Sequence, residues 1–88
     1  MLHAARDGDT EQVRRLLDCA VDVNVRDSVS ETALIHSTIG GHTEIVEMLL
    51  SRGADPNIRT AIRERALRFA VGRWPAIADI LRAHGAKS

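Results

Sequence analysis

The residues best suited to metal chemistry are the histidines and the single cysteine. His3 and His36 are separated by thirty-three residues, and two imidazoles would come together if the chain repeats with that period. Two histidines make an incomplete zinc site, and Cys19 falls on a different segment. Phe69 stands a further thirty-three residues along the chain. His3, His36 and Phe69 are therefore explained by one repeated position that packs between neighbouring repeats and accepts any ring. We therefore expect packing, with no metal and no cofactor.

The candidate nucleophiles lack the partners that catalysis needs. Nucleophilic catalysis requires a base and an orienting group beside the nucleophile, and Ser28, Ser30 and Ser37 have no evident triad. Cys19 falls near the expected end of a helix, which does not activate a thiol. The pair Gly40–Gly41 lacks the preceding strand and the following lysine of a phosphate-binding loop. The sequence predicts no catalytic residue and no enzymatic activity.

Arginines crowd one stretch in the second half of the chain. A basic patch here would meet an acidic peptide or protein; a solvated face, with the arginine stems covering the chain beneath, is the alternative of equal weight. Nucleic acid is disfavoured because the net charge is zero and the aromatic residues available for base stacking are Phe69 and Trp74. The patch comprises Arg59, Arg63, Arg65 and Arg68, with Arg73 close by.

A repeat of helix pairs must position these residues. A shift of thirty-three residues places Gly8 on Gly41 and Asn24 on Asn57, and a shift of thirty-two places Gly53 on Gly85. Apolar residues at helical spacing fill the stretches between such marks. A period of this size is typical of a solenoid, in which each unit contacts its neighbours. We expect helices over residues 2–6, 10–18, 32–39, 43–52, 65–72 and 75–84.

Three short motifs in the middle of the chain resemble the ankyrin repeat. Thr32-Ala33-Leu34 stands where that family has T-P-L, Gly41-His42 at its G-H turn, and Gly53-Ala54-Asp55 at its G-A-D. The resemblance implies an all-α solenoid in which hairpin-like fingers join the helix pairs. It divides one domain, residues 1–88, into repeats at about 1–26, 27–59 and 60–88. Ser30 stands where the family has glycine, so a distorted or looser turn is expected there.

Polar replacements mark both outer repeats as caps. Gln12 and Arg15 stand at positions that hold Ile45 and Met48 in the middle copy, and Arg82 stands where leucine occurs earlier. Terminal repeats of a stack need one side that faces water. The pattern favours a complete three-repeat protein over a fragment. Trp74 stands where the family has its Gly-His turn, and it is either an interface anchor or, as we favour, a cover for the small terminal core.

Charge and composition limit the compartment and the partner. The chain has 88 residues and a formal net charge of zero, but residues 1–44 carry −4 and residues 45–88 carry +4, which predicts an acidic and a basic end. A single cysteine gives no disulfide framework. Apolar runs are too short for a membrane span or a signal peptide. We expect a cytoplasmic monomer or weak homo-oligomer without membrane contact.

The resemblance implies that the chain binds another protein through a concave surface. In that family the finger tips and the exposed ends of the first helices form the surface. The alternatives are a self-associating or scaffold subunit and, further off, a binder of acidic ligands or nucleic acid through the arginines. Carried onto this chain, the expected partner-binding residues are Arg6, Asp7, Ser28, Val29, Glu31, Ile39, Gly40, Ala61, Ile62, Glu64 and Arg73.

Overall fold

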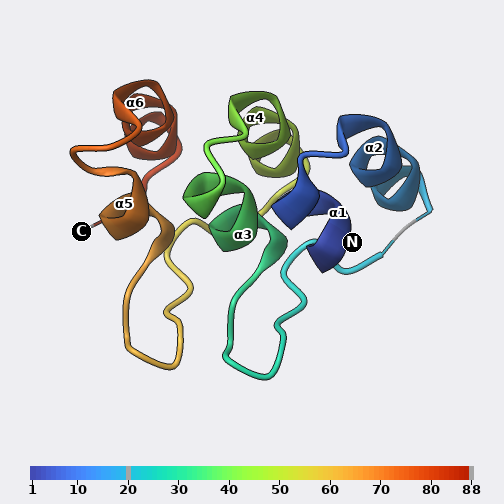
Figure 1. The fold of residues 1–88 in the computed structure, drawn as a ribbon, viewed down its shortest axis with the longest axis horizontal. Helices are drawn as coiled ribbons and strands as arrows, with labels where there is room; N and C mark the ends of the chain where they lie inside the picture. Colours follow the sequence, from blue (N-terminus) through green and yellow to red (C-terminus); the bar gives the residue numbers. More distant parts are fainter. Residues whose placement is uncertain (20, 88) are drawn as a thin grey trace.

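The computed structural model describes residues 1–19 and 21–87, and over these ranges the chain forms a row of helix pairs (Figure 1). Helices α1, α3 and α5 lie in one layer, and α2, α4 and α6 lie in a second layer beside it. Two hairpin-like fingers project from the first layer (Figure 1). In chain order the helices are α1 (Leu2–Asp7), α2 (Thr10–Asp18), α3 (Ala33–Ile39), α4 (Thr43–Ser51), α5 (Ala66–Ala70) and α6 (Pro75–Ala83).

Local signals set the starts of these helices. Asp9 caps α2, its side chain accepting a hydrogen bond from the Gln12 amide at 3.1 Å. Thr32 does the same for α3, accepting from the Ile35 amide at 3.3 Å. Pro75 begins α6, where its missing N–H would have had no partner in any case. Each cap fixes the direction in which a helix leaves its turn.

The structure confirms an all-α solenoid, and α5 is the one helix whose bounds differ from the expected ones by more than one residue. The predicted first helix of the last repeat ran over residues 65–72, whereas α5 ends at Ala70. Val71 is extended, with φ −60° and ψ 126°, and Gly72 is left-handed, with φ 80°. The last two residues of the prediction therefore belong to the turn that leads to Trp74 and α6.

The middle repeat supplies most of the core. α3 lies between α1 and α5 and contacts both, and every residue from Ala33 to Thr38 is buried. α4 adds Ile45 and Leu49, each 0% exposed, against neighbours on both sides. Burying such a side chain stabilises a fold by about 1.5–3 kcal/mol. The middle repeat therefore depends on both of its neighbours, as its apolar faces predicted.

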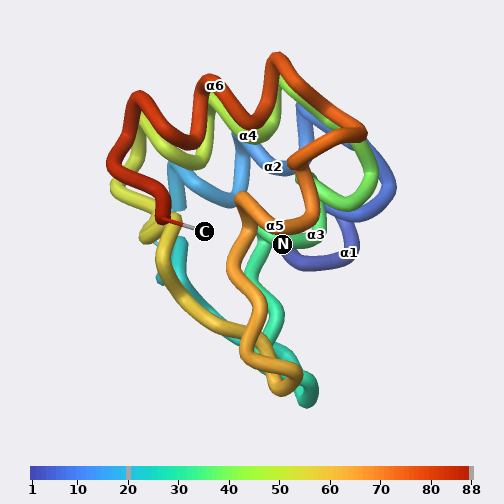
Figure 2. The backbone as a smooth tube through the Cα atoms, turned by 90° about the vertical axis from the view of Figure 1, so that its left-hand side faces the viewer, coloured from blue at the N-terminus to red at the C-terminus, as the bar shows by residue number. Residues whose placement is uncertain are grey.

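The outer repeats turn polar sides to water. Gln12, Arg15 and Arg82 are all exposed, whereas Ile45, the counterpart of Gln12, is fully buried. Figure 2 looks along the row and shows the helix pairs superimposed, with the fingers extending from one corner. The expected capping pattern is thus present at both ends of the stack.

Candidate binding surface

The first finger (residues 25–32) is a tight hairpin organised by Asp27. The Asp27 amide donates to the Glu31 carbonyl at 3.0 Å, and the Ser30 amide donates back to the Asp27 carbonyl at 3.0 Å. One carboxylate oxygen of Asp27 accepts from the amides of Val29 and Glu31 at 3.0 and 2.9 Å. A single side chain therefore satisfies the two amides that the hairpin leaves free, and this fixes the tip.

The second finger (residues 58–65) repeats this arrangement with Thr60 in place of Asp27. The Thr60 amide donates to the Glu64 carbonyl and the Arg63 amide to the Thr60 carbonyl, each at 2.8 Å. The Thr60 hydroxyl accepts from the amides of Ile62 and Glu64 at 3.3 Å. The buried Thr60 hydroxyl accepts the hydrogen bonds that the Asp27 carboxylate accepts in the first finger, so the two tips have the same shape but different charge.

Both tips hold a non-glycine residue in the left-handed region. Ser30 has a φ of 61°, and Arg63, thirty-three residues later, has a φ of 63°. Glycine adopts this conformation without steric cost, whereas a side chain at Cβ is strained there. The expected distortion at Ser30 is thus a strained residue within an intact turn. Arg63 carries the same strain because it occupies the equivalent turn position in the next repeat.

The fingers lie side by side and enclose an apolar groove. The Ala61 amide of the second finger donates to the Val29 carbonyl of the first at 3.0 Å. The groove beside this bond has a volume of about 210 Å³ and is lined by Val29, Glu31, Thr60, Ala61 and Ile62. Val29 is 47% exposed and Ile62 72%, and Ile62 is the most exposed large aliphatic residue in the described ranges.

The expected partner-binding residues separate into two groups. Val29, Glu31, Ala61 and Ile62 all line the groove, and the residue that the sequence reasoning missed there is Thr60. Ser28 and Glu64 lie on the same two fingers. A second group lies at the far ends of the inner helices, about 10 Å away along the seven residues of α3. It comprises Arg6, Asp7, Ile39, Gly40 and Arg73.

His36 joins the first finger to α3. The ring is 5% exposed, and its Nε2 lies 2.8 Å from an Asp27 carboxylate oxygen while its Nδ1 lies 3.5 Å from a Glu31 carboxylate oxygen. The pKa of Asp27 is lowered, first by the hydrogen bond from the Glu31 amide and then by the contact with His36, against the opposing effect of burial. The carboxylate therefore favours its charged form at the base of the finger.

Asp27, Glu31 and His36 form the only group of three His, Cys, Asp or Glu side chains in the described ranges whose ligand atoms are close enough to hold a metal ion. Each ring nitrogen of His36 already faces a carboxylate, and one imidazole cannot present both edges to one ion. His3, the histidine that we considered as a second ligand, is exposed on α1. The sequence does contain a signal for the cluster that we missed: in the next repeat Asp27 and His36 are replaced together, by Thr60 and Phe69.

The turn residues His42 and Trp74 occupy the same place in successive repeats. The His42 ring lies over Gly8, where an added Cβ would approach to 2.7 Å, and its Nε2 lies 3.0 Å from the Arg6 carbonyl. Trp74 lies over Gly41 at the same 2.7 Å. Trp74 thus covers the terminal core, as we favoured, and Arg73 stacks on it at 5.9 Å.

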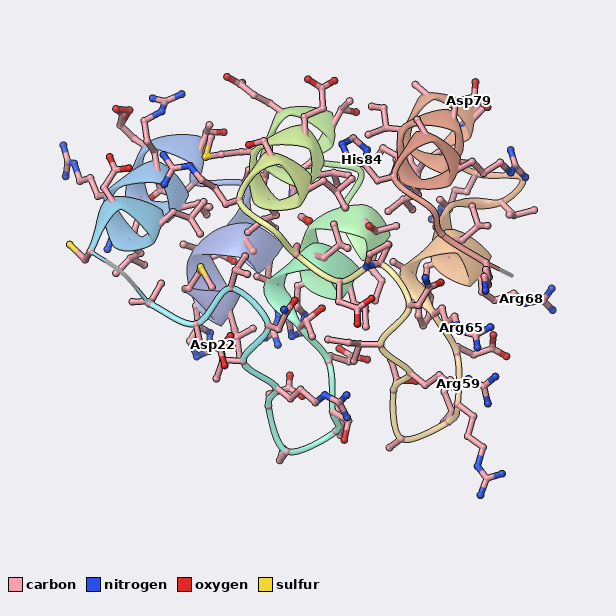
Figure 3. The ribbon with its side chains drawn as sticks, turned by 180° about the vertical axis from the view of Figure 1, so that it is seen from behind. Asp22, Arg59, Arg65, Arg68, Asp79 and His84 are labelled. Carbon is pink, nitrogen blue, oxygen red and sulfur yellow. The ribbon has the colours of Figure 1, made fainter. Side chains whose placement is uncertain are left out.

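The arginine patch lies on the outer side of the second finger and α5. Figure 3 shows Arg59, Arg65 and Arg68 on this side, away from the first finger. Arg65 is half-buried and donates from Nε to the Asn57 carbonyl at 3.3 Å. Arg68 is exposed and lies 3.8 Å from Glu64, a long ion pair that leaves most of its charge to solvent.

Comparison with known proteins agrees with this architecture. A family profile described as ankyrin repeats in three copies matches residues 1–87. Repeats of this kind generally act as protein–protein interaction modules and are typically non-enzymatic. No curated protein matches the chain. Across residues 1–19 and 21–87, every helix is too short or too polar to cross a membrane. The matched span and the stacked helix pairs show that the chain belongs to the ankyrin repeat family.

Proposed function

We propose that this chain binds a partner protein on its concave side, with the groove between the finger tips as the centre of contact. The observation that carries the proposal is the pair of exposed aliphatic residues, Val29 and Ile62, that face one groove across a single inter-finger hydrogen bond. Large aliphatic residues left in water favour association, because contact with a partner removes their surface from solvent.

The groove has the dimensions of one partner side chain. A volume of about 210 Å³ exceeds the roughly 150 Å³ that takes up a benzene ring in an apolar cavity. A branched aliphatic or phenyl side chain therefore fits as an anchor. Glu31 borders the groove and Ser28 lies at the first tip, which gives an apolar centre with a polar rim, the usual arrangement of an interface.

The second group of expected residues extends this surface. Ile39 is 42% exposed and Arg6, Asp7, Gly40 and Arg73 are exposed around it. A partner that reaches from the finger tips to these helix ends would cover much of one face of a molecule measuring 32 × 26 × 21 Å. Such a contact is small, so a weak or moderate affinity is expected. The single cysteine is consistent with the cytoplasm as the proposed compartment.

Selection from a peptide display library tests the proposal. Peptides selected on the wild-type chain should carry one large apolar residue and should lose at least about tenfold in affinity to Ile62→Asp, because the variant places a charge where the anchor is desolvated. Val21→Asp is the matched control, since Val21 is 40% exposed on the connector after α2. Selected peptides that bind Ile62→Asp as tightly as the wild type would remove the groove from the proposed function.

Self-association is the competing use of the same exposed aliphatic residues. Light scattering over a concentration series distinguishes the two. A chain that stays monomeric while it binds the selected peptides supports a separate partner. A dimer that dissociates in Ile62→Asp would assign the groove to a second copy of the chain.

A further inference from the structure

The outer edge of the second finger, the side turned away from the first finger, carries an unused backbone acceptor. Ile62 is the repeat counterpart of Val29, whose carbonyl accepts the Ala61 amide at 3.0 Å. Because the two hairpins share the same internal hydrogen bonds, the Ile62 carbonyl is directed to the corresponding place beyond the second finger. Among the described residues, no hydrogen bond reaches it. Figure 1 shows this finger at the end of the row.

The charge of this edge differs from that of its counterpart. Residues 58–68 contain four arginines and one glutamate, a net charge of +3, whereas the equivalent residues 25–35 contain one arginine and two carboxylates, a net charge of −1. Two fingers of one shape therefore differ by four charges. Shape is shared because the hydrogen bonds require it, but the hydrogen bonds do not require arginine.

Three arginines of the edge are available to a ligand. Arg59 and Arg63 are exposed and, within the part of the chain described, form no ion pair; Arg68 is exposed and has only the 3.8 Å contact with Glu64. Arg63 is held at the tip in the left-handed conformation, where glycine would be more stable. A strained position that keeps a charged side chain at a surface points to a use for that side chain.

We propose that this edge binds an acidic segment of a partner protein that lies along it in an extended conformation. One N–H of the segment donates to the Ile62 carbonyl, as Ala61 does to Val29, and carboxylates on alternate residues face Arg59, Arg63 and Arg68. Side chains of a strand alternate with a period of two, so alternate acidic residues lie on one face. The backbone acceptor favours a peptide over nucleic acid, because a phosphate offers acceptors and no donor.

This edge is distinct from the groove of the proposed function. The Ile62 side chain lines the groove between the fingers. Its carbonyl, by analogy with the Val29 carbonyl, is directed beyond the second finger. A partner could use one surface without the other. Variants of the arginines test the edge and Ile62→Asp tests the groove, so failure of one proposal leaves the other intact.

The test is an NMR titration of the isotope-labelled chain with a blocked eight-residue peptide of alternating Glu and Val. We expect saturable binding in low salt that shifts the Ile62 carbonyl carbon and the Arg63 amide. The triple variant Arg59→Gln, Arg63→Gln, Arg68→Gln should bind at least about threefold more weakly, because each exposed ion pair contributes about 1.4- to fivefold. The matched control changes Arg14, Arg15 and Arg82 to Gln, all exposed but remote from the finger.

Two further probes distinguish binding through the peptide backbone from simple attraction of charge. A peptide with the same charges but with its backbone nitrogens methylated cannot donate a hydrogen bond, and it should bind at least about fivefold more weakly. Equal affinity for the methylated peptide, or equal losses in the two triple variants, would overturn the proposal. Tighter binding of an eight-nucleotide thymidine strand at the same residues would assign the edge to nucleic acid. An Ile62 carbonyl shift that grows with chain concentration alone would assign it to a second copy.

Discussion

Replacing Leu49 by alanine tests whether the middle repeat holds the stack together. Leu49 is 0% exposed in α4, which contacts α3 and both neighbouring outer helices. The substitution removes three carbon atoms, about 0.8 kcal/mol each by transfer from water, and leaves a cavity among rigid neighbours. Leucine truncations of this kind cost about 2–5 kcal/mol. We expect about 3–4 kcal/mol here, because helices pack on both sides and limit collapse.

The expected loss is large in relation to the whole stability. A chain of 88 residues has a free energy of unfolding of about 4–13 kcal/mol. Urea denaturation followed by circular dichroism at 222 nm measures the change. With a slope of about 1 kcal/mol per molar urea, the midpoint should fall by about 3–4 M. In the lower part of that stability range, Leu49→Ala would be largely unfolded without denaturant.

Two equivalent leucines serve as controls. Leu16 stands thirty-three residues earlier in the capping repeat and is only half-buried, so Leu16→Ala should cost about 1–1.5 kcal/mol. Leu81 is 0% exposed but lies in the last repeat. If burial alone decides, Leu81→Ala costs as much as Leu49→Ala; if a neighbour on each side also matters, it costs less. Equal losses for Leu16→Ala and Leu49→Ala would refute the reasoning.

Three further predictions concern the fingers and the turns. Ser30→Gly should stabilise the fold by about 0.5–1 kcal/mol, because glycine removes the steric strain that serine has at a φ of 61°. Ser28→Gly, at a tip position without positive φ, should give no such gain. Thermal melts of the two variants measure the difference. The lowered pKa of Asp27 contributes stability that is present above the ordinary value of 3.8 and is lost as pH falls through the folded pKa. Acid titration followed by circular dichroism should therefore show a shallower loss of folded protein in Asp27→Asn than in the wild type. Equal profiles would contradict this. Gly41→Ala should lower the melting temperature more than Gly53→Ala, since both have positive φ but only the first Cβ meets Trp74, at 2.7 Å; equal shifts would show that the ring moves aside freely.

The sequence predicted the fold because the repeat made its constraints visible more than once. The glycines, the apolar stretches and the polar replacements each occur at equivalent positions, so the ends of the other five helices were located to within one residue. α5 was the exception, since no preceding copy contains a turn like Val71–Gly72. A turn that occurs once offers nothing to compare it with, and apolar spacing continues through it.

The candidate site was predicted in outline, and its contacts were not. The family resemblance placed Val29 and Ile62 at the finger tips, and both line the groove. The sequence gives no contacts within the fingers. It therefore did not predict that the buried Thr60 hydroxyl accepts hydrogen bonds from the amides of the second tip. The bond between His36 and Asp27 joins residues nine apart across a hairpin, and that contact depends on how the finger folds back onto α3.

The single hydrogen bond from Ala61 to Val29 has a mechanical consequence. Outside the helices, it is the one backbone bond between the two fingers in the described part of the chain. Breaking this one bond would free the tips to splay while α3 and α5 stay packed. Splaying would widen the groove and admit side chains of different size. The degree to which exchange of the Ala61 amide with solvent deuterium is slowed therefore measures the stability of the closed groove.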